Sequence, residues 1–403
     1  MRGLGRDMSI GQRVAWYRVR RGLTQEVLAG MVDRTSDWLG KVENGRANLE
    51  RLSVIKALAD ALDVTVGDLL GEPAIADWEP GASGRTVTLL REALMNYSAL
   101  VPSLSRMAPA PLPELNDGVQ AVWDAYQASR FGYVTVRLPR LLAGARIAAR
   151  EVTDGERREA LRLLALSYHA AAATLSKVGE ADLAWIASDR GLSAAEECED
   201  PKVVAFLARS VAHSLLANGH YSNAADIVSR AADHLTADTT TPSPAYWSLL
   251  GSLFLVGAMA AARDVRPAEA RQFLARARQA SRQLGHDGNY AWTAFGPTNV
   301  AMHDVSIAVE LGDLQTAAAL APRVNARALP VERRVRHALE VARLYTMTNQ
   351  EADALELVLL AEREAPEQVR YHYIARELTL TWLRRSKRTN VTVDDLARRL
   401  RVA

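Results

Sequence analysis

The 403-residue chain has one cysteine, Cys198, so it cannot form a disulfide within itself or a cysteine-rich metal site. We interpret Cys198 as a small buried apolar residue rather than a nucleophile. Aromatic residues are sparse at 6%, and only 5 of the 49 basic residues are lysines. The formal net charge is +2, which excludes a polycation that holds nucleic acid by overall charge.

Sequence motifs of common enzymes are also missing. The chain has no Gly-x-x-x-x-Gly-Lys-Ser/Thr phosphate loop, no His-Glu-x-x-His pair and no Gly-x-Ser-x-Gly elbow. Its 8 histidines lack the spacing of metal ligands. We therefore expect no catalytic residues, no metal and no cofactor. We also find no signal peptide and no apolar run of 18 residues, so we expect a soluble cytoplasmic protein without a membrane partner.

Two short helical segments near the N-terminus are separated by a tight break. Thr24 and Thr35 are suitable N-caps for them, because a hydroxyl accepts from a free N–H of the first turn. Val27, Leu28 and Met31 are the expected apolar face of the first segment. Trp38, Leu39 and Val42 are that of the second, and Asp33-Arg34 and Asn44-Gly45 are expected turns. This spacing predicts a helix-turn-helix, whose second helix enters the DNA major groove.

These residues resemble the Xre, or Cro-like, family of bacterial and phage regulators. The resemblance covers about 60 residues and rests on Leu-Thr-Gln-Glu at 23–26, Val-Glu-Asn-Gly at 42–45 and the Ala- and Leu-rich stretch 57–64. Asp33, Arg34 and Gly40 depart from the usual pattern, and Gly40 costs a helix roughly 1 kcal/mol relative to alanine. The alternative is a helical domain that has lost DNA binding.

The same segment supplies candidate DNA contacts. Residues near the start of the recognition helix should read base edges: Thr35, Ser36, Asp37 and, one turn on, Lys41. Residues at the flanks should bind backbone phosphates: Gln25, Arg21, Asn44 and Arg46. Because one such domain reads a half-site, we expect a homodimer on a two-fold double-stranded DNA operator.

The rest of the chain is rich in alanine and leucine and contains a hidden repeat. Its loop anchors are Gly179, Gly219, Val265, Gly312 and Asn349, spaced 40, 46, 47 and 37 residues apart. Alanine stands five residues after every anchor, and a small or β-branched residue stands seven before it. Each unit is therefore expected to be a helix, a tight loop and a second helix, with small residues where the helices cross.

This pattern resembles the tetratricopeptide repeat. We predict an all-α protein, with a five-helix helix-turn-helix domain followed by an α-solenoid of helical hairpins. The expected divisions are the DNA-binding domain at 8–71, a linker and connecting helix at 72–118, the solenoid at 119–387 and a capping helix at 388–403. An irregular helical bundle is the alternative for the solenoid. Residues 131–136 are the only possible strand, although a loop or helix junction is favoured there.

If the tetratricopeptide frame holds, the first helix of each hairpin lines a concave ligand surface. We place Asn299, Arg209, His213, Arg336 and Arg343 on that surface, with Tyr290 and Trp292 near its rim; His169 and Ser176 occupy equivalent positions. Its arginines suit a carboxylate-bearing ligand, such as a peptide C-terminus. The alternative is that these residues are structural and that the aromatic run 289–299 fills a junction between repeats.

We therefore expect a DNA-binding transcriptional regulator whose solenoid dimerises and senses a peptide or small molecule. The architecture resembles the peptide-responsive regulators of Gram-positive bacteria, in which an effector changes the pitch of the solenoid. The alternative is a DNA-binding adaptor whose solenoid docks a partner protein. No enzymatic activity is expected.

Overall fold

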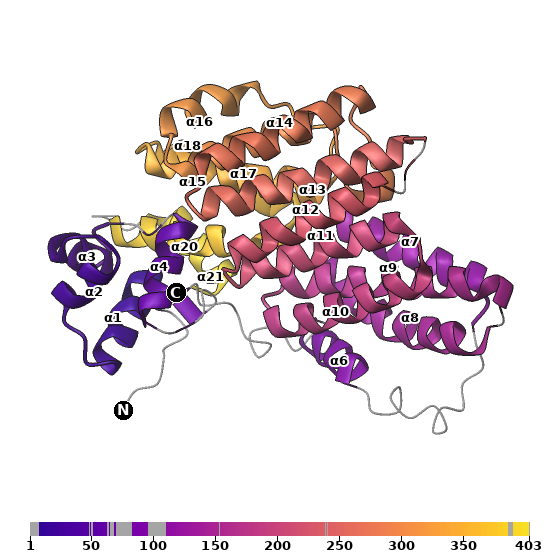
Figure 1. The fold of residues 1–403 in the computed structure, drawn as a ribbon. Coiled ribbons are helices and arrows are strands. Elements are labelled where there is room, and N and C mark those ends of the chain that lie inside the picture. Colours follow the sequence, from indigo (N-terminus) through magenta and orange to yellow (C-terminus); the bar gives the residue numbers. More distant parts are fainter. Residues whose placement is uncertain are drawn as a thin grey trace.

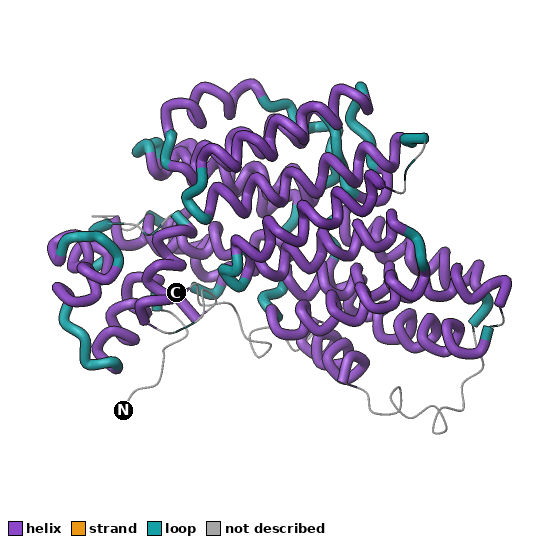
Figure 2. The backbone as a smooth tube through the Cα atoms, viewed as in Figure 1, coloured by secondary structure: helices purple, strands orange, loops and turns teal. Residues whose placement is uncertain are grey.

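The computed structural model describes residues 8–402 except 48, 50, 63, 65–67, 70–82, 96–109, 153, 238, 240 and 386–389. Within these ranges the chain is helical, and its only β pairing is an isolated bridge between Gly288 and Phe295 (Figure 2). The predicted all-α fold is confirmed.

The N-terminal domain contains four described helices, α1 Ile10–Arg20, α2 Gln25–Met31, α3 Ser36–Glu43 and α4 Leu52–Leu62. Hydroxyls start the first three, because Ser9, Thr24 and Thr35 accept from the backbone N–H groups of Gln12, Val27 and Trp38. Their core includes the fully buried Val14, Leu28, Leu39, Ile55 and Leu58. The expected fifth helix lies mostly outside the described residues.

The apolar face predicted for α2 is partly wrong. Val27 and Met31 are 49% and 56% exposed, whereas Leu28 and the neighbouring Ala29 are buried. A seven-residue helix makes barely two turns, so only one narrow stripe of it reaches the core.

The rest of the chain forms antiparallel helices that stack on one another (Figure 1). They are α6 Ser83–Met95, α7 Leu112–Gln127, α8 Phe131–Glu151, α9 Asp154–Lys177, α10 Ala181–Cys198, α11 Pro201–Ala217, α12 Tyr221–Ala237, α13 Pro244–Arg263, α14 Pro267–Leu284, α15 Pro297–Leu311, α16 Leu314–Leu320, α17 Val331–Met347, α18 Glu351–Glu364, α19 Pro366–Tyr371, α20 Tyr373–Arg385 and α21 Val391–Leu400, with 3₁₀ turns η4 Tyr290–Trp292 and η5 Ala321–Arg323.

The hairpin loops turn through left-handed residues at the predicted anchors. Gly179, Gly219 and Gly312 have φ of 81°, 78° and 79°, and Val265 and Asn349 have φ of 55° and 60°. The small residues five after and seven before these anchors are all at most 1% exposed: Ala184, Ala224, Ala270, Ala317, Ala354, Ala172, Ala212, Ala258, Val305 and Ala342. Small side chains at these positions let the paired helices approach closely.

The hairpin series begins one unit earlier than predicted. Ser129, with φ of 56°, joins α7 to α8, and Val122 and Val134 occupy the buried positions before and after it. The sequence frame missed this unit because serine and valine replace the glycine and alanine of the pattern. Accordingly α7 begins at Leu112, inside the segment assigned to the linker, and the possible strand 131–136 is the first part of α8.

One helix, α13, is long and apolar enough to cross a membrane, although the sequence was expected to have no such run. In its most apolar window, 89% of the residues are buried inside the fold. Gly251 and Gly257 of α13 receive the rings of Phe295 and Phe273, so the helix is the centre of the solenoid core.

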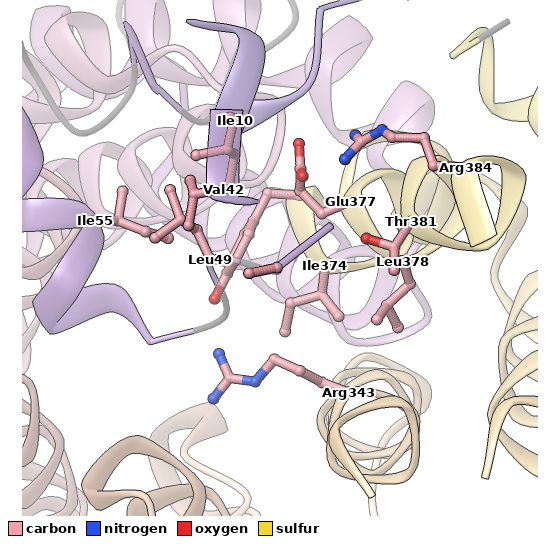
Figure 3. A pocket seen from close by; sticks show the side chains of 13 residues that line it. Ile10, Val42, Leu49, Ile55, Arg343, Ile374, Glu377, Leu378, Thr381 and Arg384 are labelled. Atoms are coloured by element: carbon pink, nitrogen blue, oxygen red, sulfur yellow. The ribbon is translucent and has the colours of Figure 1, made fainter. Parts of the chain in front are cut away.

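The helix-turn-helix domain packs against α20 (Figures 1 and 3). Ile10, Val42 and Leu49 face Ile374 and Leu378 across a small cavity of ≈ 30 Å³, and we call this contact the domain interface. The Nε of Arg51 also donates to the backbone oxygen of Glu310 at 3.1 Å, and Lys56 lies 5.9 Å from the Tyr221 ring centroid. The domain therefore has a defined position on the solenoid.

Candidate nucleic-acid interface and ligand cavity

The predicted base-reading residues lie on the solvent side of α3. Thr35, Ser36, Asp37 and Lys41 are all exposed, while Leu39 and Val42 on the opposite face are buried. Lys41 Nζ lies 2.6 Å from Asp37 Oδ2, so these two residues form an exposed ion pair one turn apart. This pair must open for either side chain to bind a base.

The recognition helix is held by a polar network beneath it. Arg18 donates to both carboxylate oxygens of Glu43, from Nε at 2.6 Å and from Nη2 at 2.8 Å. Gln25 Nε2 donates to Glu43 Oε2 at 2.7 Å. Because Glu43 is buried, this network fixes α3 relative to α1 and α2.

The predicted phosphate-contact residues have different surroundings. Gln25 uses its amide on Glu43, and Arg21 Nη1 donates to the backbone oxygen of Ala61 at 3.2 Å. Asn44 is the exposed C-cap of α3, and Arg46 is exposed just beyond it. In this geometry Asn44 and Arg46 are the more accessible of the four, and the assignment of all four stays a prediction.

A second region of interest is a cavity of ≈ 240 Å³ on the concave side of the solenoid, which we call the central cavity. Its walls come from the first helices of five hairpins, α7, α9, α11, α13 and α17, and from Tyr371, His372, Tyr373 and Arg376 around the junction of α19 and α20. Arg209, His213, Arg336 and Trp292 line it, as do His169 and Ser176. The repeat frame thus placed these residues around one space.

The central cavity is strongly basic. The side chains of six basic residues line it, namely Lys177, Arg209, Arg263, Arg333, Arg336 and Arg376, against one acidic residue, Glu340. Lys177 and Arg333 are ion-paired with Glu332, and Arg263 lies 3.5 Å from Glu310. Burial and the neighbouring cations lower the pKa of Arg209 to about 9.

Three histidines around this space are held neutral. Burial is the largest cause that lowers the pKa of His169 and His213, and the charge of Arg209 adds to it in both. The pKa of His372 falls to about 3 through burial and the charges of Lys177 and Arg336. At neutral pH these imidazoles therefore offer one donor and one acceptor each without adding charge.

Three of the predicted ligand residues do not line the central cavity. Asn299 is 2% exposed and donates from Nδ2 to the backbone oxygen of Ala294 at 2.8 Å. Asn299 was misplaced because the loop before α15 folds over the first turn of that helix. Tyr290 lies beside His286 instead, with its hydroxyl 3.3 Å from the imidazole Nε2.

The sequence also misplaced Arg343, because the side of α17 that carries it faces Glu310 and Glu340 rather than the central cavity. Its Nη2 lies 3.3 Å from Glu310 Oε1 and 3.3 Å from Glu340 Oε2, and all three side chains are buried. The guanidinium reaches the cavity at the domain interface rather than the central cavity (Figure 3). Arg343 is therefore part of a buried ion network beneath the DNA-binding domain.

Sequence reasoning missed the closing wall of the cavity. Tyr371, His372 and Tyr373 come from the end of the chain, beyond the last predicted hairpin, and no repeat spacing pointed to them. Trp123 of α7 was missed because its hairpin has no glycine anchor. No group of three potential metal ligands occurs among the described residues.

Trp292 reaches the cavity from a strained loop. Ala291, Trp292 and Ala294 all have positive φ, of 49°, 53° and 48°, which costs L-residues energy. Gln127 of α7 holds the loop by donating to the backbone oxygen of Trp292 at 3.1 Å and to Asn289 Oδ1 at 2.9 Å. The Trp292 ring then stacks on Trp123, with centroids 5.4 Å apart and planes at 15°.

Comparison with known proteins bears on the N-terminal domain. Residues 9–71 match the family model of a helix-turn-helix domain, so this segment is a helix-turn-helix domain as the sequence predicted. No curated protein sequence matches the chain. The crystal structure of Bacillus thuringiensis PlcR in complex with the peptide PapR7 and DNA is similar at a TM-score of 0.30 and 13% identity. The match covers 69% of this chain and 95% of that chain. At that TM-score the likeness relates no individual positions.

Proposed function

We propose that the protein is a cytoplasmic, sequence-specific DNA-binding transcriptional regulator that responds to an effector bound in the central cavity. The observation that carries the proposal is a helix-turn-helix domain with an exposed recognition helix, packed on a solenoid that contains a basic, aromatic-lined cavity. A concave space of this volume suits a small ligand better than the docking of a folded partner protein.

Base reading is assigned to the start of α3. Ser36 and Asp37 are exposed at its N-terminal end, which is the part of a recognition helix that approaches base edges. In a selection from random duplexes, Ser36→Ala and Asp37→Asn should each change the preferred sequence. Asp60→Asn, an exposed carboxylate on α4, is the matched control and should keep it. If both α3 variants select the wild-type sequence, the assignment is wrong.

Contact with the DNA backbone is assigned to Arg46. The side chain is exposed directly after the C-cap of α3. Arg46→Ala should weaken binding to all sequences and lower the slope of log K against log salt by about 1. An unchanged slope would count against a phosphate contact.

Communication between the cavity and the DNA-binding domain is assigned to the start of α20. Tyr373 lines the central cavity and the domain interface, and its ring packs on the core of the helix-turn-helix domain. Arg263 and Glu340 line the central cavity and join Arg343 at the domain interface through the buried ion network. An effector that binds two positions of α20 with different affinity would shift the orientation of the domain.

Dimerisation is assigned to the solenoid. One domain of this size reads a half-site, so tight binding to a two-fold operator needs two copies. Light scattering should give a dimer for the full chain and a monomer for residues 1–72, which should bind DNA poorly. A monomeric full-length protein with tight operator binding would contradict this assignment.

A further inference from the structure

Two arginines of the central cavity have no anionic partner in the part of the chain that the structure describes. Arg209 is 8% exposed, its buried Nε has no hydrogen-bond partner, and no carboxylate of the described residues is ion-paired with its guanidinium. Arg336, one helix away on α17, is partly buried and makes no ion pair or side-chain hydrogen bond. The acids near them have other partners: Glu332 is paired with Lys177 and Arg333, and Glu340 with Arg343. A buried, unpaired guanidinium is costly unless a ligand supplies the anion.

The cavity also has an aromatic cluster in its wall. Trp292 stacks on Trp123, and the ring of His169 meets Trp123 at 4.7 Å and Phe206 at 4.1 Å between centroids. Phe, Trp and Tyr make up only 6% of the chain, so three such rings together with an imidazole are a strong local concentration. The strained loop that carries Trp292 keeps its ring at the cavity. Flat rings of this kind bind a planar group by stacking.

We propose that the central cavity binds a small aromatic carboxylate, with its carboxylate on Arg209 and Arg336 and its ring against Trp292. This inference rests on the proposed function, since it names the class of effector. The volume of ≈ 240 Å³ lies below the range of about 300–1,000 Å³ for drug-sized ligands, and Tyr371, His372, Tyr373 and Arg376 form part of its wall. This volume suits a small molecule better than an extended peptide of several residues.

The buried histidine of the cavity completes the site. His169 Nδ1 is buried without a partner, and its ring lies between the tryptophan and phenylalanine rings. Burial lowers its pKa, so the imidazole stays neutral beside the arginines. It provides a hydrogen bond for a ring substituent such as a hydroxyl, while the arginines provide the charge recognition.

Isothermal titration of the full-length protein with three probes tests the class. The probe 2-naphthoate carries both ring and charge, 2-naphthamide carries the ring alone, and cyclohexanecarboxylate carries the charge without an aromatic face. We expect 2-naphthoate to bind at least about tenfold more tightly than either other probe. Equal binding of naphthoate and naphthamide, or no binding of naphthoate, would overturn the proposal. So would tight binding of a random hexapeptide mixture that naphthoate does not displace.

Variants then locate the site. Arg209→Met and Arg336→Gln should each weaken naphthoate binding at least about tenfold, and Trp292→Leu should remove its advantage over cyclohexanecarboxylate. Arg282→Gln, an exposed arginine on α14, is the matched control and should leave binding unchanged.

Arg209→Met should also raise the melting temperature of the free protein, because it removes an unpaired buried charge. If it lowers the melting temperature, Arg209 is a structural residue and the site is wrong. Since these measurements contain no DNA, their failure is distinct from a failure to bind an operator.

Discussion

Gly40 lies inside the recognition helix, at a position where the structure does not require a glycine. A Cβ added there would lie 3.5 Å from Gln25 Oε1, which is ordinary contact, and its φ is not in the left-handed region. The position therefore tolerates a side chain, and no close backbone approach explains the glycine.

Replacing Gly40 should stabilise the protein. Gly40→Ala should raise the free energy of unfolding by about 0.5–1 kcal/mol, because alanine loses less backbone entropy in a helix. Urea denaturation measures this change. Gly11→Ala is the contrasting variant, because its Cβ would lie 2.1 Å from the Val42 backbone oxygen and should destabilise the domain. A destabilised Gly40→Ala protein would show that α3 is packed more tightly than these distances indicate.

The two ion pairs of the DNA-binding domain should differ in strength. Glu43→Ala should cost about 2–3 kcal/mol, since it leaves Arg18 and Gln25 without their acceptor in a mostly buried site. Lys41→Ala breaks only an exposed pair with Asp37 and should change stability by less than about 0.5 kcal/mol. Equal effects in chemical denaturation would contradict this ranking.

At the scale of elements, α13 depends on a glycine that makes room for a ring. A Cβ on Gly251 would lie 1.9 Å from the Phe295 ring, which is itself fully buried. Gly251→Ala should therefore lower stability by about 1–3 kcal/mol through overpacking. Gly155→Ala is the control, because nothing lies within 4 Å of the added Cβ in α9. Thermal melts that rank the two variants equally would show that Phe295 can move at little cost.

The contact of α20 with α1 should depend on pH through Glu377. This carboxyl is partly buried and accepts from the Ile10 backbone; burial raises its pKa to about 7, although Arg384, Arg13 and Arg376 oppose that shift. The folded state therefore binds a proton more tightly than the unfolded state. The stability that this provides is complete below about pH 4.5 and is lost as pH rises through 7.

We expect hydrogen exchange of the α1 amides to be faster at pH 8 than at pH 5.5, after correction for intrinsic rates. The difference should amount to no more than about 2 kcal/mol in opening free energy. Glu377→Gln should remove most of this pH dependence, and Glu356→Gln, an exposed carboxyl on α18, should leave it intact. The same dependence in all three proteins would exclude Glu377 as its source.

At the scale of the whole molecule, the domain interface decides where the DNA-binding domain sits. The sequence predicted a linker after the DNA-binding domain and no contact between that domain and the solenoid, yet α1 and α3 pack on α20 through the domain interface and Arg51 reaches α15. The spacing of two domains in a dimer would then follow the solenoid rather than the linker.

Ile374→Glu should release the domain, because it places a charge opposite Ile10 in an apolar contact. Small-angle scattering should show a larger radius of gyration, while circular dichroism keeps the helical content. Leu360→Glu, at a position 49% exposed on α18, is the control. An unchanged radius for Ile374→Glu would show that other contacts hold the domain.

Local sequence predicted much of this fold. Thr24 and Thr35 each precede a helical segment, and their hydroxyls cap α2 and α3. An alanine five residues after a left-handed anchor marks a place where two helices cross closely. These features depend only on residues that lie close together in the sequence. The helix-turn-helix domain and five of the hairpins could therefore be predicted. The repeat frame also brought Arg209, His213 and Arg336 to one cavity by counting along the chain.

Tertiary structure alone decided the rest, because it depends on contacts between distant segments. Arg343 pairs with Glu310 of another helix, and the helical period does not set that partner. Even the nearby contact of Asn299 with Ala294 depends on how the loop before α15 is packed. The wall of the cavity brings Tyr371 to Trp123 and Arg209, and the packing of α20 on the N-terminal domain brings Ile374 to Ile10, so segments more than 150 residues apart meet. The periodic pattern fixes which face of each helix is buried, whereas the identity of the opposing segment follows only from how all the helices pack together.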